Sequence, residues 1–307
     1  MQTDSLFASD TTEHVESVGP LRALDELFLV AQQFSTRTEY KDLLEFIARF
    51  RMYSPFNAML VRTQMPGARY VAPPNRWRDL YMRTIRPGAR PITILQPKGP
   101  VLFVFDVSDT EPLPGAPPLP QSVVDPFAIV RGQEKGELAK TIMNAERDGV
   151  RIHEREFGSQ QAGQIQTASG GQVLQITVRK LFKQLTVTVP VRYELLLNAK
   201  QTRESRYATL VHELGHLYCG HLGSPNEQFW PNRRGLSREV EECEAESISY
   251  IVCTRLGIET NSARYVAGYL SERGKMPPIS LDTVMKAAGL IVQMGQEKLP
   301  LRKDNKE

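Results

Sequence analysis

The sequence predicts an α+β protein with two successive parts, each of which combines helices with a small sheet. Apolar residues recur at helical spacing in several stretches, and short β-type runs bounded by turn residues lie between them. The helical stretches are 21–35, 39–52, 203–221, 237–256, 262–272 and 280–296. The proline-rich stretch 111–124 separates the two parts, either as a stiff linker or as a crossover that follows the surface.

The first part, residues 21–114, is expected to pack helices on a small, mostly antiparallel sheet. One helix should begin with Ser54 as its N-cap and Pro55 at the first position, and should end before the pair Pro66-Gly67. Three strand-like runs follow this helix: 69–72, 90–97 and 100–107. A turn at Arg86-Pro87-Gly88 precedes the second of these runs.

The second part, residues 135–298, opens with a short helix at 135–147. Strand-like runs then lead to the C-terminal helices: 150–156, 171–180, 184–191 and 193–198. We expect a small sheet that leads into a helical bundle. The remaining segments are a flexible leader, a linker and a polar tail, at 1–20, 115–134 and 299–307.

The composition is that of an ordinary globular protein of 307 residues, 41% hydrophobic and 24% charged. No run of 18 apolar residues occurs, and the first residues lack the basic and apolar regions of a signal peptide. Three cysteines, Cys219, Cys243 and Cys253, are too few for a disulfide framework. These features predict a protein of the reducing cytoplasm, without a membrane partner.

Charge is distributed unevenly, although the net charge is only +3. Between residues 62 and 98 the only acid is Asp79, whereas the basic residues are Arg62, Arg69, Arg76, Arg78, Arg83, Arg86, Arg90 and Lys98. Five glutamates gather instead in the segment 237–246. A basic first part and an acidic segment in the second indicate two different tasks in one chain.

The segment 209–216, Thr-Leu-Val-His-Glu-Leu-Gly-His, carries the strongest chemical signal. His212 and His216 are four residues apart on a predicted helix, so both imidazoles lie on one face and can bind the same cation. Glu213, between them, is placed to accept a proton from a water molecule at that cation. The pattern predicts a hydrolytic site with one zinc ion, which two imidazoles and one carboxylate favour over other divalent metals.

The third metal ligand must come from elsewhere in the chain. His221 does not fit the glycine and histidine spacing of the extended three-histidine pattern, so we expect it to support a ligand or to lie at the surface. On the predicted helix 237–256, Glu244 falls near the centre of the apolar face and Glu241 near its edge. A carboxylate in a buried stripe needs a partner, so Glu244 is the expected ligand, and Glu241 is the alternative.

The same helical projection directs Glu242 and Glu246 away from the apolar face. The side chains that we consider for stabilising an oxyanion are Tyr250, Tyr218, Tyr193 and Arg238. The strand at 193–198 precedes the histidine-bearing helix and is a candidate for aligning an extended peptide by β-addition.

The motif HELGH, followed about 28 residues later by the helical segment Glu-Ala-Glu-Ser, resembles the ImmA/IrrE group of gluzincin-like metallopeptidases. In that group the glutamate before the alanine is the third ligand, and that glutamate corresponds to Glu244. The resemblance implies a gluzincin-like α+β metallopeptidase domain, with catalytic Glu213 and zinc ligands His212 and His216.

The first part resembles the N-terminal domain of ArdC-type antirestriction proteins. The matching features are Ser54 and Asn57, Trp77, the turn at 86–88, the strand ending at Pro97 and the segment Phe105–Thr110. Together the two resemblances cover residues 39–114 and 190–295. They imply a partner that is single-stranded DNA.

Basic and aromatic side chains within residues 69–90 are compatible with single-stranded DNA, since arginines follow the phosphates and aromatic rings stack on bases. The candidates are Arg69, Tyr70, Arg76, Trp77, Arg78, Tyr81, Arg83, Arg86 and Arg90, although Trp77 is better suited to the core. Three hypotheses follow. The chain is a zinc peptidase, or an antirestriction protein that acts by binding DNA with a structural or regulatory zinc, or a DNA-responsive regulator that cleaves a repressor.

Overall fold

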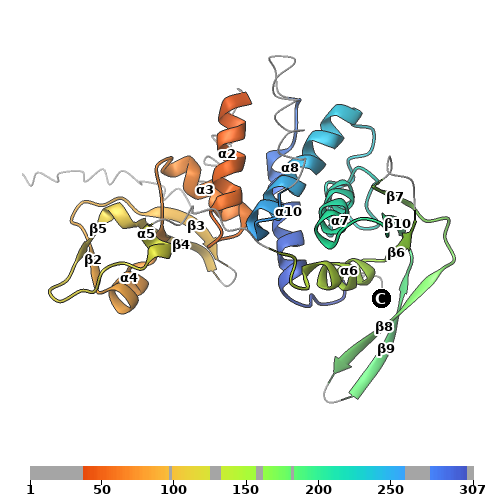
Figure 1. Ribbon diagram of the computed structural model, residues 1–307, viewed down its shortest axis with the longest axis horizontal. Coiled ribbons are helices and arrows are strands. Elements are labelled where there is room, and N and C mark those ends of the chain that lie inside the picture. The colour runs from red at the N-terminus through yellow and green to blue at the C-terminus, as the bar shows by residue number, and fades with distance from the viewer. Residues whose placement is uncertain are drawn as a thin grey trace, which may run out of the picture.

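The computed structural model describes residues 37–96, 99–124, 133–156, 162–180, 183–259 and 277–302. Helices and strands are mixed throughout, so the α+β prediction is confirmed. Figure 1 shows the chain as two lobes joined by a central group of helices, with the first part of the sequence on one side and the second on the other. Two predicted helices, 21–35 and 262–272, lie outside the described residues.

The first lobe begins with helices α2 (Arg37–Arg49) and α3 (Pro55–Gln64). The prediction for α3 is confirmed, because the Ser54 side chain accepts a hydrogen bond from the backbone of Asn57 and Pro55 opens the helix. Its buried side is formed by residues that are fully enclosed: Ala58, Met59, Leu60 and Val61.

Two antiparallel sheets follow, as expected for this part. The first has the order β1-β4-β3, from β1 (Val71–Ala72), β4 (Gly99–Asp106) and β3 (Ile92–Gln96), and the second pairs β2 (Arg83–Ile85) with β5 (Thr110–Pro112). Helix α3 is fastened to β3 by two amide side chains. Asn57 exchanges two hydrogen bonds of 2.9 Å with the backbone of Leu95, and Gln64 exchanges two of 2.8 Å with Thr93.

The sequence did not predict helix α4 (Pro74–Tyr81), which lies between β1 and β2. Trp77 is fully buried on this helix, and its indole donates a hydrogen bond to Phe105 O at 2.9 Å. Tyr70 and Tyr81 pack against Trp77 and join their hydroxyls at 2.7 Å. This aromatic cluster forms a small core separate from the main one.

The proline-rich stretch is a crossover that follows the surface rather than a free linker. Its first residues form β5, which pairs with β2, after the 3₁₀ turn η1 (Val107–Asp109). Its last residues form the short helix α5 (Gln121–Val124), from which Val123 enters the aromatic cluster. The stretch therefore follows the surface of the first lobe with its prolines exposed, and it is held at its two ends by β5 and Val123.

The second lobe contains α6 (Glu137–Arg147) and a three-stranded sheet of order β6-β10-β7. Strands β6 (Val150–Arg155) and β10 (Tyr193–Asn198) are parallel, and β7 (Gly163–Thr167) runs antiparallel to β10. The sequence analysis missed β7. The two long strands β8 (Val173–Lys180) and β9 (Lys183–Pro190) form a hairpin that projects from the lobe (Figure 1).

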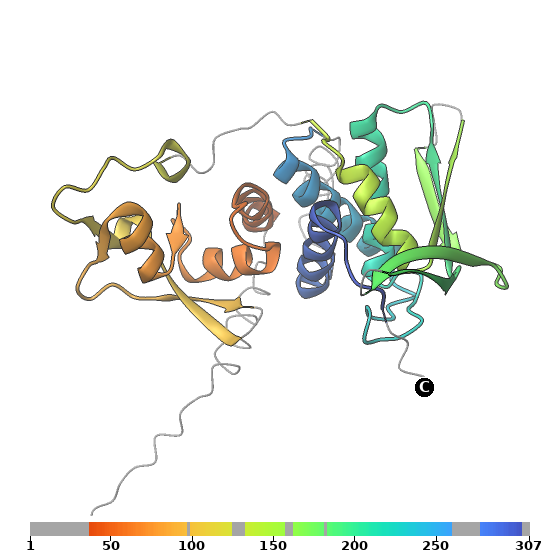
Figure 2. The ribbon, with the colours of Figure 1, turned by 90° about the horizontal axis from the view of Figure 1, so that it is seen from below.

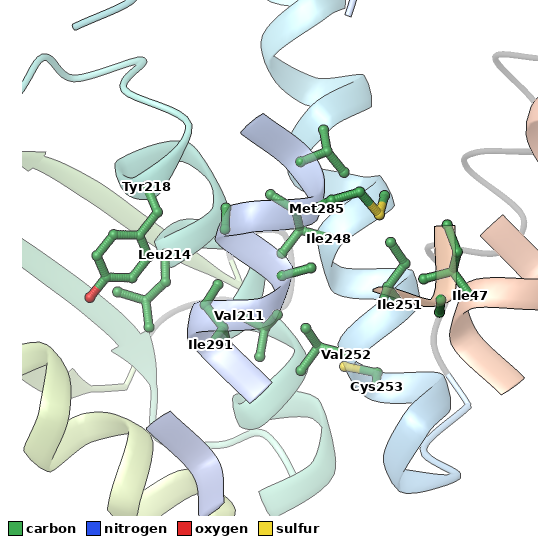
Figure 3. Close-up of a cluster of buried hydrophobic side chains, with 14 of the residues drawn as sticks. Ile47, Val211, Leu214, Tyr218, Ile248, Ile251, Val252, Cys253, Met285 and Ile291 are labelled. Atoms are coloured by element: carbon green, nitrogen blue, oxygen red, sulfur yellow. The ribbon is translucent and has the colours of Figure 1, made fainter. Parts of the chain in front are cut away.

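Three long helices complete the lobe: α7 (Arg203–Tyr218), α8 (Arg238–Leu256) and α10 (Leu281–Gln296). Figure 3 shows their apolar side chains meeting in one cluster, in which Val211 and Leu214 of α7 face Ile248 of α8 and Ile291 of α10. Ile47 of α2 belongs to the same cluster. Figure 2 shows α2 and α3 beside the C-terminal helices, so the main core runs continuously through both lobes.

Candidate metal centre

Helix α7 carries the two histidines on one face. Thr202 caps its N-terminus, and the buried side chains Leu210, Val211, Leu214 and Leu217 fix it against the core. The Nε2 atoms of His212 and His216 face each other at 3.2 Å. The helix therefore presents two ring nitrogens to a single point, as the HExxH spacing predicts.

Helix α8 approaches this face very closely because of a glycine. A Cβ at Gly215 would lie 3.2 Å from the Cα of Ala245, which is closer than most such contacts, so glycine favours the close approach of the two helices. The close approach brings the carboxylates of α8 to the two histidines of α7.

The carboxylate that reaches the histidines is that of Glu242. Its Oε2 lies 3.6 Å from His212 Nε2 and 3.9 Å from His216 Nε2. These three side chains are partly exposed, so the point at which they meet is accessible to solvent. The helical projection that directs Glu242 away from the apolar face of α8 did not reveal that this side of the helix faces the histidines.

The Glu244 carboxylate, expected as the third ligand, is not brought to the two histidines. It is fully buried and accepts hydrogen bonds from Arg233 at 2.6 and 2.8 Å, from His221 at 2.9 Å and from the backbone of Ser280 at 2.6 Å. The prediction that Glu244 is buried is confirmed. The centre of the buried face of α8, however, is directed into the core and not towards His212 and His216. A metal open to water needs a carboxylate at the edge of that face, where Glu242 lies. Glu241, the alternative, is half-buried and does not join the group.

Each histidine also has a partner for its other ring nitrogen. His212 Nδ1 lies 3.4 Å from Glu246 Oε1, and His216 Nδ1 lies 2.9 Å from His221 Nδ1. Such partners orient the ring of a metal-binding histidine and select the tautomer that leaves Nε2 free. The sequence signal for Glu246 was its position four residues after Glu242, on the same side of α8.

The electrostatic environment keeps His216 neutral. Burial, together with the nearby His212 and His221, lowers its pKa to about 3, although the charge of Glu244 acts in the opposite direction. A neutral imidazole is the form that binds a metal.

Glu213 is placed beside the histidines as predicted, against strand β7. Burial raises the pKa of its carboxyl group, while His212 and a backbone hydrogen bond from Ile165 act in the opposite direction. A Cβ at Gly163 of β7 would lie only 2.9 Å from the Leu196 carbonyl oxygen and 3.6 Å from Glu213 Cγ. The same Cβ would lie 2.5 Å from Thr209 Cγ2, so glycine allows β7 to pass close to helix α7, next to Glu213.

The donor set fits a zinc ion. With Zn–N distances of about 2.0–2.1 Å and tetrahedral geometry, two nitrogen ligands are separated by about 3.3 Å, close to the 3.2 Å between the Nε2 atoms. Two unprotonated nitrogens at this separation repel each other, unless a cation or a proton lies between them. The oxygen of Glu242 is slightly farther away and would complete three protein ligands.

Of the four side chains considered for an oxyanion, only Arg238 lies at the site, with its Nε 3.6 Å from Glu242 Oε1. The hydroxyl of Tyr218 is buried on Asp148, and that of Tyr193 donates to Gly223 O. Tyr250 has Glu45 and Arg49 of α2 as its charged neighbours. The three tyrosines therefore have neighbours other than the two histidines.

The residues considered for nucleic-acid binding divide into two sets. Trp77 and Tyr70 are buried and cannot stack on a base, Tyr81 is half-buried against them, and Arg83 is held by Thr110 at 2.7 Å. The exposed ones are Arg69, Arg76, Arg78, Arg86 and Arg90. The exposed residues of this set are therefore all arginines, whereas its aromatic residues pack in or against the small aromatic core.

The fold and the site define an α+β protein with a candidate metal centre of the HExxH type. No family model matches the sequence, and no curated protein matches it. A solved structure that is similar is the metal-free crystal structure of the ArdC antirestriction protein from the R388 plasmid, at 15% identity and a TM-score of 0.34. The likeness covers 80% of this chain and 84% of that chain. In the part of the chain that the structure describes, no helix is long and apolar enough to span a membrane.

Proposed function

We propose that this chain is a zinc-dependent peptidase whose first lobe binds single-stranded DNA. The observation that carries the peptidase proposal is the convergence of His212 Nε2, His216 Nε2 and the Glu242 carboxylate beside the half-buried Glu213. Two imidazoles and a carboxylate with solvent access are the ligand set of a hydrolytic zinc site.

A zinc ion held there would supply Lewis acidity for a peptide carbonyl and a water molecule. Glu213 is the base that takes a proton from the attacking water and delivers it to the leaving amine. The pKa of the Glu213 carboxyl group is raised towards neutral pH. A group whose pKa lies nearer to the working pH can both accept a proton from water and donate it to the leaving amine. Arg238, exposed at the rim, is placed to stabilise negative charge on the substrate.

The extended substrate is expected along β7 rather than along the predicted strand 193–198. That strand, β10, is paired on both sides, with β6 and with β7, so it has no free edge. Strand β7 is an edge strand among the described residues, and it lies beside Glu213. An edge strand offers the backbone donors and acceptors that align an extended peptide.

The substitution Glu213→Gln tests the peptidase proposal. We expect the variant to bind one zinc ion as tightly as the wild type and to lose cleavage of fluorescein-labelled casein by at least about 100-fold, since the proton acceptor is lost. Glu239→Gln, an exposed residue of α8, is the matched control and should retain activity. Retained cleavage in Glu213→Gln would remove Glu213 from the mechanism.

The exposed arginines support the proposal that the first lobe binds single-stranded DNA. We expect Arg76→Glu combined with Arg78→Glu to weaken binding of an oligothymidine at least tenfold and to reduce its salt dependence. The control is Arg49→Glu combined with Arg155→Glu, which changes the net charge by the same amount at two exposed arginines outside the basic segment. Equal losses in both double variants would mean that only total charge matters.

A second candidate function is DNA protection by binding alone, with a structural or regulatory zinc, and the basic surface favours it. The two can be separated by measuring protection of transferred DNA from restriction. If Glu213→Gln keeps protection and the Arg76, Arg78 double variant loses it, binding is the function. The opposite result assigns protection to proteolysis, with a regulatory protein such as a repressor as the proposed substrate class.

A further inference from the structure

A second group of side chains with metal-binding chemistry lies directly behind His216. Cys219, His221 and Glu244 are all buried and close enough to share one ion. Their hydrogen-bond partners, however, indicate that the group supports His216 and does not bind an ion of its own. His221 lies between His216 and Glu244, with 2.9 Å on each side.

Arg233 makes this group unsuitable for a second cation. Its guanidinium binds both oxygens of Glu244, at 2.8 and 2.6 Å, and so already neutralises the carboxylate. The backbone N–H of Ser280, which caps helix α10, donates to the same carboxylate at 2.6 Å. A divalent ion at Glu244 would have to displace these donors and would be repelled by Arg233.

The hydrogen bonds along this group fix the protons on both histidines. The Glu244 carboxylate only accepts, so His221 Nε2 must donate to it. In a neutral His221, Nδ1 is then the acceptor, and His216 Nδ1 must donate to it. His216 Nε2 is thereby left unprotonated, with its lone pair directed towards His212 and Glu242.

We propose that His221, Glu244 and Arg233 form a buried relay that fixes the tautomer and the ring orientation of His216 for metal binding. The inference rests on the proposed metal centre and assigns these three residues as positioning residues. The relay also links the metal centre to the start of α10 through Ser280. His212 has the simpler support of Glu246, which is partly exposed to solvent.

Two substitutions of one residue test the relay. His221→Phe keeps the shape of the ring and removes the acceptor for His216 Nδ1, whereas His221→Asn keeps an oxygen near that position. We expect His221→Phe to weaken zinc binding about 10–100-fold, measured by competition with a chelating dye, and His221→Asn to recover most of that loss. The absorption spectrum of bound Co²⁺ should change in His221→Phe and return in His221→Asn.

Because His221 is buried, its substitution can prevent folding, so a second variant tests the relay at another residue. Arg233→Met acts at the partly exposed end of the relay, and we expect it to weaken zinc binding at least threefold without altering the circular dichroism spectrum of the metal-free protein. Wild-type affinity and an unchanged Co²⁺ spectrum in His221→Phe, or in Arg233→Met if the former does not fold, would overturn the relay.

Metal stoichiometry separates this inference from the proposed function. If the wild type binds no zinc, the metal centre itself fails. If it binds one zinc ion that His221→Phe does not affect, only the relay fails. If it binds two ions and Cys219→Ser removes one of them, the buried group is a second metal site, and the relay is wrong.

Discussion

At the residue scale, the site depends on which glutamates of α8 face which neighbours. Glu242 and Glu246 reach the histidines, whereas Glu244, between them, turns into the core and binds Arg233. The periodicity of α8 correctly predicts that the Glu244 carboxylate is buried and needs a partner. The partner is a guanidinium and a histidine rather than a metal, which no pattern in α8 alone reveals.

Removal of the Glu242 carboxylate charge should therefore disrupt metal binding more than any change at Glu241. We expect Glu242→Gln to lower zinc affinity at least about 100-fold, because a ligand contributes more than the residues behind it. Isothermal titration of the metal-free protein measures this directly. Glu241→Gln is the control on the same helix, and wild-type affinity in Glu242→Gln would exclude it as the third ligand.

The three cysteines should be unreactive in the native protein. All are buried free thiols, and burial raises the pKa of Cys243 and of Cys253 to about 12 and that of Cys219 well above its usual value. We expect no reaction with a thiol-specific chromogenic reagent at pH 8, and three thiols to react after unfolding in guanidinium. Rapid labelling of one native thiol would show that its part of the core opens.

At the element scale, the spacing of α7 and α8 decides whether the histidines and Glu242 meet. Alanine at Gly215 would place a Cβ 3.2 Å from the backbone of Ala245, so the two helices would have to separate. We expect Gly215→Ala to destabilise the fold by about 1 kcal/mol or more and to weaken zinc binding, measured by denaturant titration and dye competition.

Gly289→Ala in α10 is the matched control for that substitution. There a Cβ would lie 3.7 Å from Pro55 Cδ, an ordinary contact. Because alanine is the better helix former, we expect Gly289→Ala to raise stability by about 0.5–1 kcal/mol. A similar gain in Gly215→Ala would show that the close approach does not constrain the site.

The long helices were predictable from the sequence, and two short elements were not. The pattern of 203–221 and 237–256 anticipates α7 and α8 because each buries a long apolar face. Helix α4 has Trp77 as its single buried residue, and β7 has mostly polar side chains, so neither carries a periodic signal. Both are held in place by neighbours: Phe105 binds Trp77, and β10 pairs with β7.

At the scale of the whole molecule, the two lobes are joined by a shared core and by a half-buried arginine. Arg255 at the end of α8 donates hydrogen bonds to Ile47 O and Phe50 O at the end of α2 and to Tyr53 O, at 2.8, 3.1 and 2.8 Å. Burial lowers its pKa to about 10, so it stays charged at neutral pH. Helix α8 thus connects the first lobe to the candidate metal centre.

Arg255→Met should loosen this connection. The three carbonyl groups would lose a charged donor, and we expect the free energy of unfolding to fall by about 2–4 kcal/mol in chemical denaturation. Arg51→Met removes a single, exposed hydrogen bond to Thr254 O across the same junction and should cost less than about 1 kcal/mol. Equal effects of the two changes would argue against a special role for Arg255.

The sequence by itself determined the α+β class, the main helices, the histidine pair with Glu213 and the basic character of the first lobe. These features depend on local spacing and composition, which can be read directly from the order of the residues. The position of Glu242 beside the histidines, the burial of Glu244 on Arg233 and His221, and the place of β7 beside Glu213 follow from the tertiary structure alone. These positions depend on how closely α7 approaches α8 and on which strand of the sheet is left at its edge. Both are set by contacts between segments far apart in the chain.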